Sequence, residues 1–316
     1  MSLRDTPQYG DTMDNHVEII PGVFAYPNTV ETGRGKVEYS INDGDMPVVM
    51  SVHGGMGGFD QARILVDFLG EKNWRLLCPS RPGYLGTPIE SGRTMEEQAD
   101  LLAALLDTLK IDKVAVICAS AGGPPGYFFA IRHPDRIKAL VPIDAVSGFY
   151  DMPDSAGPVA KALFLSDIGQ KILLAMEERK PESFLQEIFS TSAYFTKEQI
   201  RLHTEHALKS PDALAFLRAF MVTMSPYAKR KTGTENDLLQ FKKFTHLPVE
   251  GIKCPTLIVH GTHDADVKFY DGVYAYEHIP GAKRYWIEEG SHVGFWLNPR
   301  ANEAHQAVRD FITGIK

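Results

Sequence analysis

Ser120 is the residue best placed for covalent chemistry, because its hydroxyl follows directly on a short apolar run. Residues 114–119 read as a buried strand, and an apolar stretch of helical length follows the serine. A sharp strand-to-helix turn would present the hydroxyl as a nucleophile, and it requires small residues two positions before and after the serine. Those positions hold Cys118 and Gly122, and the cysteine departs from the usual glycine. The alternative is a buried strand that runs into a helix beginning with small residues.

A second chemical feature is the glycine-rich stretch His-Gly-Gly-Met-Gly-Gly at 53–58. Its four glycines let the backbone approach a bound group closely. The stretch lacks the G-x-G-x-x-G spacing and the Lys-Ser/Thr pair of phosphate-binding loops. Together with Ser120 it predicts an oxyanion hole, in which the backbone N–H groups of Ala121 and Gly55 are the donors. Met56 is the alternative to Gly55, and a merely tight turn is the simpler interpretation of the whole stretch.

The elements that must position these groups alternate between strand and helix. Such alternation with apolar strands implies a mostly parallel sheet that helices cover on both faces. The predicted strands are 17–26, 36–41, 47–52, 74–78, 114–119, 137–143, 254–261 and 283–287. The predicted helices of this part are 59–72, a helix to Leu109 that opens with the capping box at Thr94, the helix after Ser120, 269–278 and a final helix ending near Ile315.

The alternation stops after Asp144. Between 145 and 251 the sequence has no clear strand and four helical stretches, at 159–178, 181–191, 197–209 and 211–223. We therefore predict a core made of residues 17–144 and 252–316, a helical cap at 145–251, and an N-terminal tail at 1–16. Six apolar cap residues are candidates for the lining of a pocket, although packing inside the cap is the simpler interpretation of each one: Phe149, Tyr150, Met152, Phe164, Leu165 and Phe220.

The composition excludes several classes of protein. The chain has 316 residues, 44% of them hydrophobic, and a net charge of -7, which disfavours nucleic acid and anionic membrane surfaces as partners. The sequence contains no run of about 18 apolar residues, so it predicts no transmembrane helix, and residues 1–15 lack the apolar region of a secretory signal. The three cysteines lie far apart in the sequence, which favours reduced thiols in a cytoplasmic protein.

In its motifs and their order, the chain resembles the α/β-hydrolase superfamily from residue 17 onward. The resembling motifs are Val-His-Gly-Gly at 52–55, Ser-Arg-Pro-Gly-Tyr at 80–84, Cys-Ala-Ser-Ala-Gly-Gly at 118–123, His-Pro-Asp-Arg at 133–136, Pro-Thr-Leu-Ile-Val-His-Gly-Thr-His-Asp at 255–264 and Gly-Ser-His at 290–292. The resemblance implies the α/β-hydrolase fold, with a mostly parallel sheet flanked by helices and a helical cap insertion.

The family's chain order of nucleophile, acid and base implies Ser120, Asp264 and His292 as a catalytic triad. A serine hydroxyl needs a base to take its proton, and the imidazole needs a carboxylate to fix its tautomer. Asp144 competes for the role of the acid, because some relatives carry their acid after the equivalent strand. Asp266 is expected to point in a different direction from Asp264, since side chains alternate along an extended loop.

The remaining polar residues near the predicted site are expected to brace loops. His53 and His260 end strands at the catalytic edge, and Arg81 follows the next strand after 53–58. A metal site from the two histidines with His263 and Asp264 is conceivable, but no ligand spacing requires one. We therefore expect neither a metal nor a cofactor.

The resemblance implies a serine hydrolase that cleaves a small to medium carboxylic ester, or a lactone, with an apolar acyl or alcohol part. A meta-cleavage-type C–C hydrolase is an alternative, although that group normally has Gly-Asn-Ser at the nucleophile. A ligand-binding receptor on a hydrolase scaffold is an alternative of another class. Haloalkane dehalogenases and epoxide hydrolases are disfavoured, because they use aspartate where this chain has Ser120. The oligomeric state is open, with a homodimer as one option.

Overall fold

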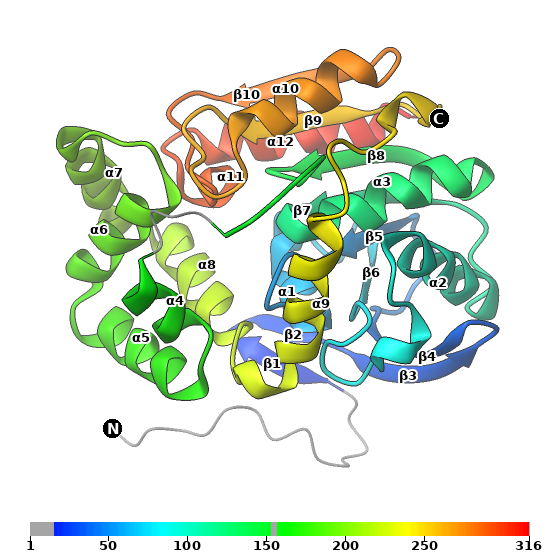
Figure 1. The fold of residues 1–316 in the computed structure, drawn as a ribbon, viewed down its shortest axis with the longest axis horizontal. Helices are drawn as coiled ribbons and strands as arrows, with labels where there is room; N and C mark the ends of the chain where they lie inside the picture. Colours follow the sequence, from blue (N-terminus) through cyan, green and yellow to red (C-terminus); the bar gives the residue numbers. More distant parts are fainter. Residues whose placement is uncertain (1–15, 153–156, 316) are drawn as a thin grey trace.

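The central element of the computed structural model, which describes residues 16–152 and 157–315, is an eight-stranded sheet. Its strand order is β10-β9-β8-β7-β5-β6-β4-β3 (Figure 1). The six strands from β5 to β10 run parallel, whereas β4 pairs antiparallel with both β6 and β3 at one edge. The bounds are β3 Pro27–Thr32, β4 Gly35–Ser40, β5 Val48–Val52, β6 Arg75–Pro79, β7 Val114–Ala119, β8 Ile137–Ile143, β9 Leu257–Gly261 and β10 Lys283–Ile287.

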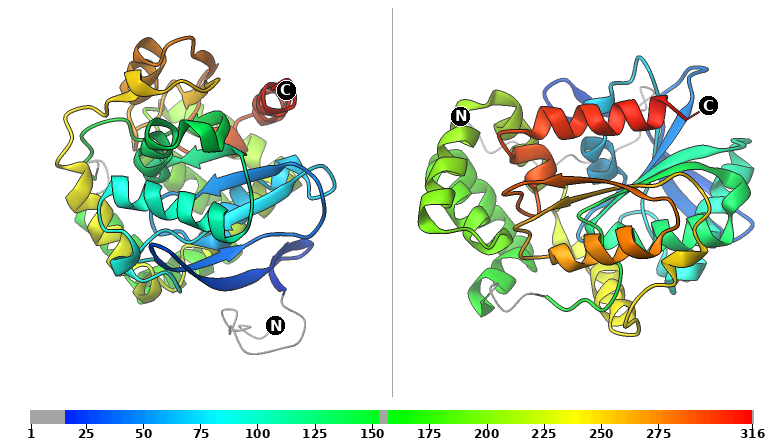
Figure 2. Two further views of the ribbon diagram at one scale, coloured as in Figure 1. Left: turned by 90° about the vertical axis from the view of Figure 1, so that its right-hand side faces the viewer. Right: turned by 90° about the horizontal axis from the view of Figure 1, so that it is seen from above.

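Helices cover both faces of the sheet (Figure 2), as the apolar strands require. Side chains alternate along β7, so that Val116 and Cys118 face a core shared with α2 and α3, while Ala115 and Ile117 face the core shared with α1 and α12. The bounds of the flanking helices are α1 Phe59–Leu65, α2 Met95–Thr108, α3 Gly123–Arg132, α10 Phe269–His278, α11 Gly294–Leu297 and α12 Ala301–Thr313. The capping box predicted at Thr94 is present at the start of α2.

Six further helices lie between β8 and β9 in the chain and form the helical insertion (Figure 1). Their bounds are α4 Pro158–Phe164, α5 Asp167–Arg179, α6 Pro181–Ser192, α7 Lys197–Lys209, α8 Pro211–Val222 and α9 Lys231–Phe241. Helices α5 to α8 share an apolar core of their own, which includes Leu173, Phe184, Ala207 and Leu217. No helix in the described part of the chain is both long and apolar enough to span a bilayer.

Two predicted elements differ from the observed ones near the N-terminus. The strand predicted at 17–26 is a separate hairpin of β1 Val17–Ile20 and β2 Val23–Ala25, which turns at Gly22 with a φ of 84°. The partner of β4 is β3, in a segment predicted as a turn. Pro27 is tolerated there because it is the first residue of an edge strand, where a missing N–H costs little.

The helical insertion also differs from its prediction in two places. The helix predicted at 159–178 is interrupted at Ser166, whose side chain accepts a hydrogen bond from the N–H of Gly169 and caps a new helix, α5. Helix α9 was not predicted. It is weakly amphipathic and buries polar residues such as Asn236 and Asp237 beside apolar ones, so hydrophobic periodicity gives little sign of it.

Candidate active site

Ser120 lies at the turn between β7 and α3, with a backbone φ of 52°. A non-glycine residue in this left-handed region is strained, and such strain is frequent at functional sites. Gly122 makes the turn possible, because a Cβ atom there would lie 2.5 Å from the carbonyl oxygen of Val52. The small residue predicted two positions after the serine is therefore required by the close passage of β5.

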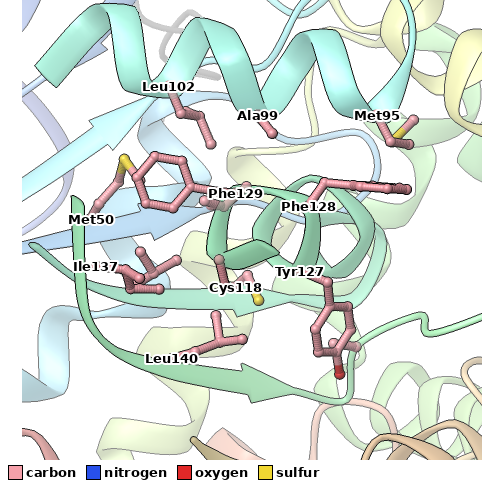
Figure 3. Close-up of a cluster of buried hydrophobic side chains, with 14 of the residues drawn as sticks. Met50, Met95, Ala99, Leu102, Cys118, Tyr127, Phe128, Phe129, Ile137 and Leu140 are labelled. Carbon is pink, nitrogen blue, oxygen red and sulfur yellow. The ribbon is translucent and has the colours of Figure 1, made fainter. Parts of the chain in front are cut away.

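Cys118, two positions before the serine, faces away from the site. Its side chain lies in the apolar cluster between β7, α3 and β8, near Tyr127 and Leu140 (Figure 3). A Cβ atom on Gly126 would lie 2.7 Å from its Sγ atom, so a glycine in α3 makes room for the thiol. Burial raises the pKa of the Cys118 thiol, which therefore behaves as a small apolar group.

His292 connects Ser120 to Asp264. Its Nε2 atom lies 3.0 Å from Oγ of Ser120, and its Nδ1 atom lies 2.8 Å from Oδ2 of Asp264. The loop after β9 carries the aspartate, and the loop after β10 carries the histidine. The main-chain carbonyl of Ser192, at the end of α6, accepts hydrogen bonds from the N–H groups of His292 and Ala265. The helical insertion thus ties the two loops together.

Asp264 is fully buried and held from both sides. Its Oδ1 atom accepts hydrogen bonds from the N–H groups of Asp266 and Val267 at 2.8 and 3.0 Å, and its Oδ2 atom faces His292. Burial raises the pKa of Asp264, and the charge of His292 opposes this shift. Burial lowers the pKa of His292, but the carboxylates of Asp264 and Asp266 outweigh it, so the pKa of His292 is raised.

Asp144, the competing acid, lies near this pair without a hydrogen bond to the imidazole. Its backbone φ is 45°, and its Oδ1 atom accepts a hydrogen bond of 2.7 Å from the N–H of Gly261. Its Oδ2 atom is buried without a hydrogen-bond partner among the described residues. Burial and the charge of Asp264 raise the pKa of Asp144 well above its ordinary value. The geometry therefore favours Asp264 over Asp144 as the partner of His292.

The glycine-rich stretch lies beside Ser120, and its main chain is fixed by Arg81. The carbonyl of Gly54 accepts hydrogen bonds from Nη2 of Arg81 at 3.1 Å and from Nδ1 of His53 at 2.7 Å. The peptide that follows is trans, so the N–H of Gly55 points away from these donors. A Cβ atom on Gly55 would lie 3.8 Å from that of Ala121, which places the two predicted donor residues next to each other.

The side chains of Arg81, His53 and His260 brace loops through hydrogen bonds, as expected. The guanidinium of Arg81 is buried and forms a bidentate pair with Asp237 of α9, at 2.9 and 2.6 Å. The Nε2 atom of His53 accepts a hydrogen bond from the N–H of Arg81, and burial lowers the pKa of His53. His260 donates from Nε2 to the carbonyl of Val267, and burial lowers its pKa to about 4.

Asp144, His260 and Asp264 form a group whose atoms lie close enough to ligate a cation, within 4.8 Å of one another. Two of these atoms already have partners, because Nε2 of His260 donates to Val267 and Oδ2 of Asp264 accepts from His292. His263, which the sequence analysis also considered, hydrogen-bonds Thr262 through Nδ1. The donor set is therefore engaged in holding the loops around His292.

A cavity of about 230 Å³ opens above Ser120, between the strand ends and the helical insertion. Its walls are mostly apolar and come from α4, α6, α8 and α9 as well as the core. Five of the six apolar residues predicted to line a pocket do so, namely Tyr150, Met152, Phe164, Leu165 and Phe220. Phe149 does not line the cavity: this side chain is largely exposed to solvent, whereas its neighbour Tyr150 faces the cavity.

Sequence reasoning missed two polar residues that line this cavity. Asp237 belongs to the unpredicted helix α9, and no sequence signal linked it to Arg81. Asp266 was expected to point elsewhere, but the loop is turned around the side chain of Asp264 instead of extended. Its Oδ2 atom therefore lies 3.4 Å from Nε2 of His292. The lone clue to Asp266 was its closeness in sequence to Asp264.

Comparisons with known proteins support the assignment of the fold. The model of the α/β hydrolase fold family matches residues 47–299. An uncharacterized hydrolase of Bacillus subtilis, YcgS, is 26% identical over 90% of this chain and 97% of its own. A 2-hydroxy-6-oxononadienedioate/2-hydroxy-6-oxononatrienedioate hydrolase of Burkholderia vietnamiensis is 23% identical, over 91% of this chain and 94% of its own.

Among solved structures, an α/β hydrolase fold protein from Nakamurella multipartita superposes with a TM-score of 0.84 at 34% identity, covering 90% of this chain and 98% of the other. The enol-lactonase from Burkholderia xenovorans LB400 superposes with a TM-score of 0.61 at 21% identity, covering 90% of this chain and all of the other. The second likeness concerns the fold alone. With its sheet, its strand-to-helix turn at Ser120 and the family match over most of its length, the chain belongs to the α/β hydrolase fold family and is a hydrolase.

Proposed function

We propose that this hydrolase cleaves a small to medium carboxylic ester, or a lactone, through Ser120, His292 and Asp264. The observation that carries the proposal is the continuous path from Oγ of Ser120 to Nε2 of His292 at 3.0 Å, and from Nδ1 of His292 to Oδ2 of Asp264 at 2.8 Å. This arrangement suits transfer of the serine proton to a base whose tautomer is fixed.

In the proposed cycle, Oγ of Ser120 attacks the ester carbonyl carbon while Nε2 of His292 takes its proton. The oxyanion is stabilised by the N–H groups of Ala121 and Gly55. The imidazolium then protonates the leaving alcohol, and an acyl-enzyme remains on Ser120. Water attacks this acyl group as Nε2 of His292 takes one of its protons. The bond between the acyl carbon and Oγ of Ser120 then breaks, the imidazolium returns its proton to Oγ, and the carboxylic acid leaves. Asp264 stays ionised throughout and stabilises the imidazolium.

The substrate class follows from the cavity. Its lining is predominantly aliphatic and aromatic, which favours an apolar acyl or alcohol part, and its size suits a small to medium substrate. We assign the helical insertion, residues 145–251, the role of a cap that closes the cavity over Ser120. The core would then consist of residues 17–144 and 252–316.

A C–C hydrolase is the second candidate, and one observation favours it. Relatives that match more than nine-tenths of this chain are named as hydrolases of 2-hydroxy-6-oxononadienedioate, a dicarboxylate. The sequence around the nucleophile, Cys-Ala-Ser, differs from the Gly-Asn-Ser expected for such enzymes. The third option, a receptor without turnover, has less support because a base lies at hydrogen-bond distance from Ser120 and a carboxylate lies at hydrogen-bond distance from that base.

The test combines covalent labelling with a substrate screen. A fluorophosphonate should add one equivalent of mass to Ser120, and Ser120→Ala should prevent both labelling and turnover. Short- and long-chain esters, lactones and a ring-fission dienoate should then be compared. Turnover of the dienoate alone would assign the C–C reaction, and binding without turnover of any compound would assign the receptor. Labelling at another residue would overturn the nucleophile.

A further inference from the structure

A second carboxylate faces the imidazole of His292 on the side of the nucleophile. Oδ2 of Asp266 lies 3.4 Å from Nε2 of His292, the same atom that lies 3.0 Å from Oγ of Ser120. Asp264 occupies the opposite edge of the ring, at Nδ1. Orientation of the imidazole requires one carboxylate at Nδ1, so the proposed ester cleavage gives Asp266 no role.

Asp266 is held in a fixed position. The hydroxyl of Tyr150, from the loop after β8, donates a hydrogen bond of 2.6 Å to its Oδ1 atom. The N–H of Asp266 donates to Asp264, which fixes the backbone. Its Oδ2 atom faces Nε2 of His292, and the side chain lines the same cavity as Ser120. About a third of the side chain is exposed, which leaves it accessible to a bound molecule.

Other charges in the cavity do not neutralise Asp266. Asp237 is paired with Arg81, and Asp144 lies away from Asp266, where burial raises its pKa and its Oδ1 atom accepts a hydrogen bond from the N–H of Gly261. Among the described residues that line the cavity, Lys161 is the single lysine or arginine, and it makes no ion pair with Asp266 within 4.0 Å. When His292 is neutral, as it must be to act as the base, the area next to the nucleophile therefore carries negative charge within otherwise apolar walls.

The position of Asp266 relative to the reaction indicates which part of the substrate it meets. In the proposed cycle, Nε2 of His292 gives its proton to the leaving oxygen, so this oxygen must lie within hydrogen-bond distance of Nε2. Oδ2 of Asp266 then lies beside the first carbon atoms of the alcohol part. A substituent one carbon beyond the ester-bearing carbon can reach it.

We propose that Asp266 selects the alcohol part of the substrate, by binding a hydroxyl or ammonium group near the leaving oxygen and by excluding a carboxylate there. The inference rests on the proposed ester hydrolysis. It goes further, because it names the chemistry of the alcohol. A fixed carboxylate accepts a hydrogen bond or attracts a cation, and it repels a second anion most strongly where water is scarce.

The test uses hexanoate esters that differ in the alcohol alone: propyl, hydroxyethyl, carboxymethyl, choline and neohexyl. Neohexyl is the uncharged analogue of choline, and propyl is the match for hydroxyethyl and carboxymethyl. At low salt, kcat/KM should be about tenfold higher for choline than for neohexyl, about fivefold higher for hydroxyethyl than for propyl, and about tenfold lower for carboxymethyl than for propyl. The hydroxyethyl and choline arms separate hydrogen bonding from charge.

Asp266→Asn should bring each of these ratios to within about threefold, because the amide keeps the shape and removes the charge. Asp151→Asn is the matched control. It removes an exposed carboxylate next to Tyr150 that pairs with Lys242, and it should leave the ratios unchanged. Ratios near one in the unmodified enzyme, or an equal effect of Asp266→Asn on all five esters, would overturn the inference and leave ester hydrolysis standing. Failure to hydrolyse any ester would overturn both.

Discussion

Replacing Asp264 by asparagine should lower kcat by about four orders of magnitude, and the reason lies in the hydrogen bonds of the carboxylate. Oδ1 of Asp264 accepts from the N–H groups of Asp266 and Val267, so the oxygen of an asparagine amide must remain at that position. The amide nitrogen then replaces Oδ2, which lies 2.8 Å from Nδ1 of His292.

An NH₂ group at this position cannot accept a hydrogen bond, so Nδ1 becomes the acceptor and the ring proton moves to Nε2. That proton then faces Oγ of Ser120 at 3.0 Å, and the base cannot take the serine proton. A 10⁴-fold loss corresponds to a barrier increase of about 5.5 kcal/mol. Little of it should appear in the stability of the fold, because the side chain keeps its shape and both backbone hydrogen bonds.

Asp144→Asn is the matched comparison and should leave kcat within about tenfold. The asparagine oxygen can keep the hydrogen bond from Gly261, and Asp144 makes no hydrogen bond to the imidazole of His292 that the substitution could remove. Its NH₂ group would be buried where Oδ2 has no partner, at a cost of about 1–3 kcal/mol in unfolding free energy. Steady-state and burst kinetics on a hydrolysed ester, with thermal unfolding in parallel, measure both effects. A large loss in Asp144→Asn and a small one in Asp264→Asn would refute the assignment.

Three further outcomes are expected. His292 must be neutral to act as the base, and the carboxylates of Asp264, Asp266 and Asp144 raise its pKa. Asp266→Asn should therefore shift the acid limb of kcat/KM by about one pH unit toward lower pH. A shift toward higher pH would contradict this electrostatic effect. Cys118→Ala should keep kcat while lowering the unfolding free energy by about 1 kcal/mol, and the native thiol should resist alkylation; rapid inactivation traced to Cys118 would show that it reaches the site. Arg81→Met should lower kcat about 10²-fold and destabilise the fold by about 3–5 kcal/mol, because the buried carboxylate of Asp237 loses its counter-charge and keeps the hydroxyl of Tyr84 as a hydrogen-bond donor. The double variant Arg81→Met/Asp237→Leu should regain unfolding free energy but not kcat. Recovery of both quantities would show that Arg81 does not position the glycine-rich stretch.

The core of the fold was predictable from the sequence because its strands carry strong local signals. The runs at 114–119 and 137–143 are apolar throughout, and both strands have the predicted bounds. The helix 269–278 and the strand 283–287 also match, since turn residues flank them. The prediction missed the hairpin β1–β2 although Pro21-Gly22, a pair typical of turns, separates its two strands.

In the candidate site, some residues were predicted from sequence motifs, whereas the positions of others depend on the tertiary structure. Motif order predicted Ser120, Asp264 and His292 as a set, and the structure places His292 within hydrogen-bond distance of the other two. Their catalytic roles stay a prediction. The position of Asp266 depends on a turn that forms around the side chain of Asp264. The expectation that Asp266 points away from Asp264 was wrong, and alternation does not support it, because residues two apart in an extended chain lie on the same side. The partner of Arg81 is 156 residues away in a helix without a clear apolar stripe, so its identity required the tertiary structure.

Two buried ion pairs explain why the helical insertion does more than cover the cavity. Arg81 of the core pairs with Asp237 of α9, and Arg230, also from the insertion, pairs with Asp60 and donates to the carbonyl of Gly57. A buried charge that loses its partner is costly, so these pairs favour a single arrangement of the segment against the core. Both pairs end on the glycine-rich stretch or on α1, which begins directly after it. The same stretch supplies the proposed oxyanion donor, so the position of α9 and the geometry around Ser120 depend on each other.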